Sequence, residues 1–146
     1  MRTRIFLAGL AAAAATLLSV GTGSSQAETK KPYTIYLSNN FVGNDWRQQM
    51  LRSADIAAKK PPLAGRVDLK VEVVETTVQA QINSLNSIIR NKPDAILIDA
   101  GSGEALNPTI KKACDAGIVV VAFDQIVSAP CAYTLESDWS RAPRVE

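Results

Sequence analysis

Two short apolar runs, each followed by an aspartate, set the pattern of this chain. Residues 95–98 (AILI) precede Asp99, and residues 119–123 (VVVAF) precede Asp124. Both runs are rich in branched aliphatic side chains and apolar on both faces, which is typical of strands in a parallel sheet that helices cover on both sides. A Gly-rich stretch and a helical segment lie between the two runs. The pattern therefore predicts a strand, a crossover helix and a second parallel strand.

The rest of the chain repeats this alternation of strands and helices. Apolar and charged residues alternate at 67–73, which predicts a strand at a sheet edge with one wetter face. Helix starts are predicted at Asn44, at Thr77 and at Asn107, which is followed by Pro108 in the first turn. Besides the strands at 95–98 and 119–123, two more strands are predicted at 33–37 and 132–136. A further helix is predicted to start with Ser137 or Asp138 as its cap.

These elements predict an α/β fold, a doubly wound three-layer sandwich. Its mostly parallel sheet has the strand order 2-1-3-4-5, with right-handed crossovers. In this order the direction of winding changes between the first and third strands, and ligands bind outside the carboxyl ends of strands at such a point. The loops at 38–46 and 99–103 flank this point, and Asp124 and Gln125 follow the next strand. We therefore expect a ligand crevice there.

The first 27 residues have the pattern of a cleaved signal peptide. Arg2 and Arg4 precede an apolar stretch at 5–20, and a small-residue cleavage site ends at Ala27. The full chain has 16 Lys+Arg and 14 Asp+Glu, so removing the two leader arginines leaves 14 of each. A neutral product without a basic run does not indicate a nucleic-acid partner. We predict a soluble domain over residues 28–146, exported to the periplasm.

Cysteine and histidine usage narrows the chemistry further. The chain has no histidine, which excludes a Ser-His-Asp triad, a Cys-His dyad and the commonest zinc ligand sets. Cys114 and Cys131 are predicted to form a disulfide in an oxidising compartment, and two buried free thiols are the alternative. The two cysteines are too far apart for a CxxC redox motif. We predict no metal, no cofactor and no enzymatic activity.

The side chains expected at the crevice are amides, hydroxyls, carboxylates and an indole. Carboxylates and amides match the hydrogen-bonding groups of vicinal hydroxyls, and an aromatic face stacks on a sugar ring, so the set suits a neutral polyol. Plainer interpretations stay open: Asn44 only starts a helix, Trp46 packs in the core, and Asp99 caps a turn. Asp124 is harder to explain in this way, because a charge at the end of a central strand needs partners or a ligand.

The combination of these segments resembles the first half of a type I periplasmic binding protein, in particular the ribose-binding-like sugar receptors of ABC importers. The resemblance rests on the strand that runs into Ser38-Asn39-Asn40, the Asn44-Asp45-Trp46 helix start, and the segments 92–98, 107–117 and 119–125. It implies that Asn44 contacts a sugar hydroxyl, that Trp46 stacks on the ring and that Asp124 accepts hydrogen bonds from two hydroxyls. Gln125 stands where the pentose receptors commonly place arginine, so the particular sugar stays open. Weaker candidates on the same face are Ser38, Asn39 and Asp138.

The resemblance implies an exported solute-binding protein, acting as a monomer, that delivers a monosaccharide or similar polyol to a permease in the inner membrane. The alternatives are a receptor for a sugar-like signal that feeds a chemoreceptor or sensor kinase, and an inactive truncated lobe. Receptors of this family close two lobes around the sugar, and residues 28–146 correspond to an incomplete first lobe. We therefore expect weak affinity from this lobe alone.

Overall fold

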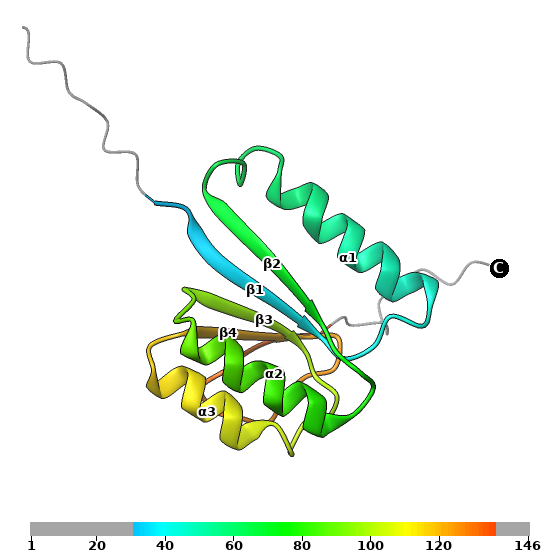
Figure 1. The fold of residues 1–146 in the computed structure, drawn as a ribbon, viewed down its shortest axis with the longest axis vertical. Helices are drawn as coiled ribbons and strands as arrows, with labels where there is room; N and C mark the ends of the chain where they lie inside the picture. Colours follow the sequence, from blue (N-terminus) through cyan, green and yellow to red (C-terminus); the bar gives the residue numbers. More distant parts are fainter. Residues whose placement is uncertain (1–30, 137–146) are drawn as a thin grey trace, which may run out of the picture.

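The computed structural model describes residues 31–136, which form a sheet with three helices (Figure 1). The predicted leader at 1–27 and the predicted helix start at Ser137 or Asp138 lie outside these residues. The elements in chain order are β1 (Tyr33–Asn39), α1 (Asp45–Ala58), β2 (Val67–Val73), α2 (Val78–Arg90), β3 (Ala95–Asp99), α3 (Asn107–Asp115), β4 (Val119–Phe123) and β5 (Tyr133–Leu135).

The five strands form one sheet of order β2-β1-β3-β4-β5, and every neighbouring pair is parallel. This confirms the predicted strand order and the edge position of β2. The register pairs Leu37 with Leu97, and Leu97 with Val121, so the carboxyl ends of β1, β3 and β4 lie at the same edge of the sheet. Asn39 pairs with Asp99 at that edge.

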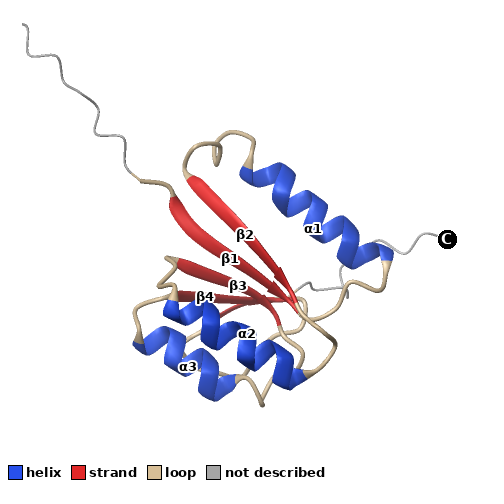
Figure 2. Cartoon of the chain, in the orientation of Figure 1, coloured by secondary structure: helices blue, strands red, loops and turns tan. Residues whose placement is uncertain are grey.

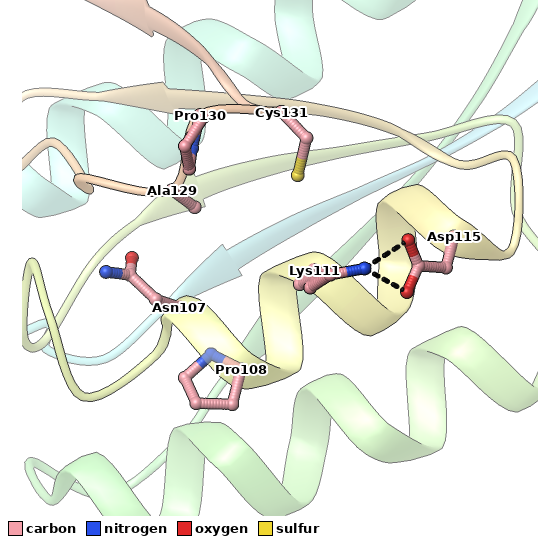
Figure 3. Close-up of a pocket in the computed structure, with 7 residues that line it drawn as sticks. All are labelled: Asn107, Pro108, Lys111, Asp115, Ala129, Pro130 and Cys131. Carbon is pink, nitrogen blue, oxygen red and sulfur yellow. Dashed lines mark hydrogen bonds and ion pairs between the residues drawn. The ribbon is translucent and has the colours of Figure 1, made fainter.

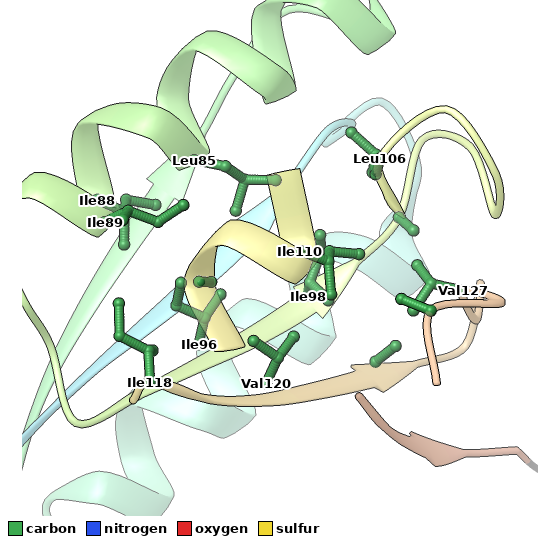
Figure 4. Close-up of a cluster of buried hydrophobic side chains, with 14 of the residues drawn as sticks. Leu85, Ile88, Ile89, Ile96, Ile98, Leu106, Ile110, Ile118, Val120 and Val127 are labelled. Carbon is green, nitrogen blue, oxygen red and sulfur yellow. The ribbon is translucent and has the colours of Figure 1, made fainter. Parts of the chain in front are cut away.

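Helices α2 and α3 lie side by side over one face of the sheet, and α1 lies beside β2 (Figure 2). The main core forms under α2 and α3, because every second residue of β3 and β4 points toward these helices. Figure 4 shows side chains of α2 and α3 converging on those of the strands. The fully or almost fully buried members include Leu85, Ile88, Ile96, Ile98, Ile110 and Val120.

The opposite face of the sheet, which we call the α1 face, is apolar and less covered. Val119, Tyr133 and Leu135 lie on this face of β4 and β5 and are 47%, 69% and 66% exposed. In residues 31–136, α1 is the helix on this side, and it lies beside β2 at the far edge of the sheet. Apolar sheet surface is therefore left open over β4 and β5.

The helix starts agree with the predictions at two of three positions. The Asn44 side chain accepts a hydrogen bond from the backbone N–H of Arg47 (2.8 Å), and Thr77 accepts one from Ala80 (3.1 Å). The prediction that Asn107 caps α3 is wrong. The fully buried Leu106 occupies that position, and the Asn107 side chain instead donates to the Ser128 hydroxyl (2.7 Å).

A disulfide joins Cys114 of α3 to Cys131, just before β5, as the sequence predicted. The bridge ties the segment that follows β4 to the helix layer. Within residues 31–136, no helix combines the length and the hydropathy needed to cross a membrane.

Candidate functional site

The carboxyl ends of the three central strands bring polar side chains together around one arginine of α1. Asn39 is the last residue of β1, Asp99 the last of β3, and Asp124 directly follows β4. Arg47 lies in the first turn of α1 and is only 4% exposed. The site therefore forms at the edge that the strand order predicted, with a buried cation at its centre.

The guanidinium of Arg47 contacts residues from all three strand ends. Its Nη1 donates to Asn39 Oδ1 (2.6 Å) and forms an ion pair with Asp99 Oδ2. Its Nη2 lies 3.6 Å from Asp124 Oδ2. Asn39 is itself fully buried, and its amide nitrogen donates to the carbonyl oxygen of Phe41. The arginine thus links the ends of β1, β3 and β4 through one charge-assisted hydrogen bond, to Asn39, and through ion pairs with Asp99 and Asp124.

Asp99 is completely buried, which sets its protonation. Burial raises the pKa of Asp99 from 3.8 to about 6, although the positive charge of Arg47 acts in the opposite direction. The nearby carboxylate of Asp124 also raises the pKa of Asp99. Asp99 is therefore the internal counter-ion of Arg47 and becomes protonated in mildly acidic solution.

Asp124 differs from Asp99 in exposure and in backbone conformation. Its side chain is 41% exposed, and its φ is +59°, in the left-handed region that aspartate tolerates better than most residues. Backbone strain of this kind is concentrated at functional sites. The turn presents a carboxylate at the end of β4 that is free on its outer side to accept hydrogen bonds.

Gln125 closes the cluster on its other side. With its amide oriented to satisfy both groups, its nitrogen donates to the Ala100 carbonyl (2.6 Å) and its oxygen accepts from Arg47 Nη2 (3.2 Å). The backbone N–H of Ala100 donates to the Gln125 carbonyl oxygen (3.2 Å). The segment after β4 is therefore held against the end of β3.

Ser38 and Asn39 do not line the same face, contrary to the expectation from sequence. Neighbouring residues of a strand point to opposite sides of the sheet. Ser38 faces α2, is 1% exposed, and its hydroxyl lies 3.3 Å from the amide nitrogen of the buried Gln81. Only Asn39 points toward Arg47. The structure thus brings Asn39, Asp124 and Gln125 together and leaves Ser38 behind the sheet.

The Gly-rich loop after β3 packs against protein side chains. The backbone N–H of Gly101 donates to Gln81 Oε1 (2.8 Å), and Gln81 also donates to the Asp99 carbonyl (2.9 Å). A Cβ at Gly101 would lie 2.6 Å from the amide nitrogen of Asn40 and 3.1 Å from Gln81 Oε1. Glycine allows this close approach, because a larger residue at 101 would force the Asn40 and Gln81 side chains to shift.

Trp46 and Asn44 lie at the exposed start of α1, next to the buried cluster around Arg47. Trp46 is 47% exposed, so it is not a core residue, and the guanidinium carbon of Arg47 lies 5.5 Å from its ring centre. This is within the range of a cation–π contact. Asn44 is exposed, and its side-chain oxygen caps α1. The capping role predicted for Asn44 is confirmed, and its contact with a sugar stays a prediction.

Sequence reasoning missed two buried polar residues, Arg47 and Gln81. A cation in the first turn of a helix is unfavourable next to the positive end of the helix dipole, so Arg47 was a signal that carboxylates lie nearby. Asp99 and Asp124, at the ends of adjacent strands, were those carboxylates. Gln81 carried no comparable signal, because one glutamine in an amphipathic helix is ordinarily exposed.

A groove of about 520 Å³ lies away from this cluster, between α3 and the segment before β5 (Figure 3). Its walls are mostly apolar and include Pro108, Ala129, Pro130 and the disulfide-bonded Cys131. None of the residues predicted to contact a ligand lines it. The polar cluster, rather than this groove, matches the chemistry expected from sequence.

Comparison with known proteins identifies the family. Residues 35–145 match the family described as "Periplasmic binding protein domain". The chain belongs to the periplasmic binding protein family. Within this family it is 34% identical, over 100 residues, to the D-ribose/D-allose-binding protein of Pseudomonas aeruginosa, an alignment that covers 67% of this chain and 31% of that protein.

Solved structures of periplasmic binding proteins agree with the fold. An ABC transporter solute-binding protein of Thermobispora bispora is 39% identical with a TM-score of 0.62, covering 73% of this chain and 34% of that one. A solute-binding protein of Actinobacillus succinogenes with bound D-allose is 27% identical with a TM-score of 0.61, covering 69% and 34%. The chain thus spans about a third of the length of these relatives, which are solute-binding transport proteins.

Proposed function

We propose that residues 31–136 are a sugar-binding lobe of an exported solute-binding protein that serves an ABC importer. The observation that carries the proposal is the presentation of Asp124. Its carboxylate is 41% exposed at the carboxyl end of β4, while the arginine behind it is buried. A carboxylate in this position accepts two hydrogen bonds from neighbouring hydroxyls of a sugar.

The neighbouring side chains complete a site for a polyol. Trp46 offers an exposed ring to the C–H face of a sugar, and Asn44 lies at the adjacent helix start. Membership of the periplasmic binding protein family and the sugar named for the Pseudomonas and Actinobacillus relatives support this choice. The ligand class we propose is an uncharged monosaccharide, with D-allose and D-ribose as the first to test.

The domain assignment is part of the same proposal. The aligned segment is about a third of the length of its relatives, and apolar sheet surface lies open over β4 and β5 on the α1 face; both support residues 31–136 as one part of a larger ligand-binding unit. We propose that residues 1–27 are a cleaved leader, that the protein acts in the periplasm as a monomer, and that it delivers its ligand to an inner-membrane permease. Because one lobe supplies part of the contacts, we expect a Kd on the order of 1 mM, about −4 kcal/mol.

A titration that follows the indole N–H signal of Trp46 by NMR tests the proposal. The chain has two tryptophans, and a Trp139→Phe variant identifies the Trp46 signal. We expect a saturable shift with D-allose or D-ribose, and a loss of affinity of at least about tenfold in Asp124→Asn. Asp115→Asn, which removes an exposed carboxylate of α3, is the matched control and should bind like the wild type. If no sugar shifts the signal, or if both variants bind equally, the proposed site is wrong.

A further inference from the structure

Arg47 is the side chain of the site that contacts the ends of three strands. It is 4% exposed, and its two terminal nitrogens are shared among four side chains from three strand ends. Nη1 serves Asn39 and Asp99, and Nη2 serves Gln125 and lies near Asp124. Each terminal nitrogen therefore donates to one amide oxygen, that of Asn39 or Gln125, and has one carboxylate beside it as an ion-pair partner. Because Arg47 is almost fully buried behind Asp124 and Gln125, little of the guanidinium is accessible to a ligand.

From this arrangement we propose that Arg47 is a positioning residue, which fixes the Asp124 carboxylate and the Gln125 amide for the ligand without binding the ligand itself. The inference rests on the sugar-binding function proposed above and deepens it. Arginine suits this role because its planar fork reaches acceptors on two sides in a fixed geometry, whereas a lysine ammonium acts as a point charge.

The two aspartates beside Arg47 have different roles. Asp99 is fully buried and is the closer ion-pair partner, so it compensates the buried cation. Asp124 lies 3.6 Å from Nη2 and keeps 41% of its side chain exposed, so the arginine orients it without covering it. Removing Arg47 therefore frees the rotation of Asp124 and leaves its charge in place.

The different exposure of the two aspartates also determines which class of sugar the site binds. The charge that the site shows to solvent is the carboxylate of Asp124, and Asp45 is a second exposed carboxylate in the first turn of α1. The positive charge lies behind them and is compensated by Asp99. A phosphorylated or acidic sugar would meet negative charge without a free cation. The site is therefore selective for uncharged sugars over anionic sugars of the same size.

The test compares Arg47→Lys with Arg52→Lys, a matched change at an exposed arginine on the same helix. The first measurement needs no ligand: the three-bond Hα–Hβ couplings of Asp124 report whether its side chain holds one rotamer. We expect one rotamer in the wild type and in Arg52→Lys, and averaged couplings in Arg47→Lys. A single Asp124 rotamer in a folded Arg47→Lys protein would overturn the positioning role.

The second measurement is the affinity for D-ribose and for D-ribose 5-phosphate. We expect the wild type to bind ribose more tightly than its phosphate, and Arg47→Lys to lose about tenfold in ribose affinity. Tighter binding of the phosphate by the wild type would mean that Arg47 contacts the ligand, and would overturn the inference. If the wild type binds neither of these sugars nor D-allose, the proposed function fails, and the couplings of Asp124 still decide whether Arg47 positions it. If Arg47→Lys does not fold, the Hα–Hβ couplings of Asp124 are measured in Asn39→Ala instead. This variant removes a hydrogen-bond partner of the guanidinium.

Discussion

The buried carboxyl group of Asp99 makes the stability of this protein depend on pH in an unusual direction. Its pKa is about 6 in the folded protein, whereas 3.8 is the ordinary value expected after unfolding. Between these two values the folded state binds the proton more strongly than the unfolded state. The contribution of Asp99 to the free energy of unfolding is therefore largest below about pH 4, and it is lost as the pH rises through about 6.

The size of the effect follows from the interval between the two pKa values. Each pH unit in this interval is worth about 1.4 kcal/mol, so the interval from 3.8 to about 6 amounts to about 3 kcal/mol. This is a large part of the 5–15 kcal/mol typical of a domain's total stability. Other carboxylates also titrate in this range, so the contribution must be isolated by a variant that lacks Asp99.

The assay is urea unfolding of the wild type and of Asp99→Asn at a series of pH values from 4 to 7.5. Asp99→Asn leaves Arg47 without its buried counter-ion, which lowers stability by a roughly constant amount. Relative to this variant, the wild type should lose about 2 kcal/mol between pH 4 and pH 7, because the rest of the effect falls below pH 4. The control Asp115→Asn removes an exposed carboxylate and should change stability by less than about 1 kcal/mol at either pH. Parallel pH profiles for the wild type and Asp99→Asn would refute the account of Asp99.

Three further changes test the fold around the site. Ile98→Ala, at a fully buried position of β3, should lower the free energy of unfolding by about 3 kcal/mol in urea titrations, whereas Ile56→Ala, at a half-exposed position, should lower it by less than about 1 kcal/mol. Reduction of the Cys114–Cys131 bridge, which spans 17 residues, should lower thermal stability by about 3 kcal/mol, and an unchanged melting temperature in reductant would contradict this. Asn44→Ala should cost about 1 kcal/mol through the lost helix cap, and Asn44→Asp should restore it; equal stability of the two variants would exclude the cap.

Much of the fold could be predicted because its signals are local. The runs at 95–98 and 119–123 are apolar on both faces, and each ends at an aspartate, so strand type and sheet edge followed from a few residues. The cap at Asn44 was equally local. The start of α3 was displaced by one residue, because the fully buried Leu106 anchors that turn through tertiary packing.

The candidate site was less predictable because its geometry depends on contacts between distant segments. Asp99 and Asp124 were recognised, but their burial differs completely: Asp99 is fully buried beside Arg47, whereas the Asp124 side chain is 41% exposed. Arg47 contacts the three strand ends only in the folded sheet, where they lie at the same edge. Ser38 is a different case: its position facing α2 follows from the alternation of a strand, which the sequence interpretation did not apply to it.

The proposed sugar site lies where β1, β3 and β4 end. Backbone amide NMR of the leaderless protein, with D-allose added in steps, tests it most directly. We expect the shifted signals to cluster at Asn44, Trp46, Asp124 and Gln125. Shifts confined to the groove between Pro108 and Cys131, or no shifts with any monosaccharide, would contradict it.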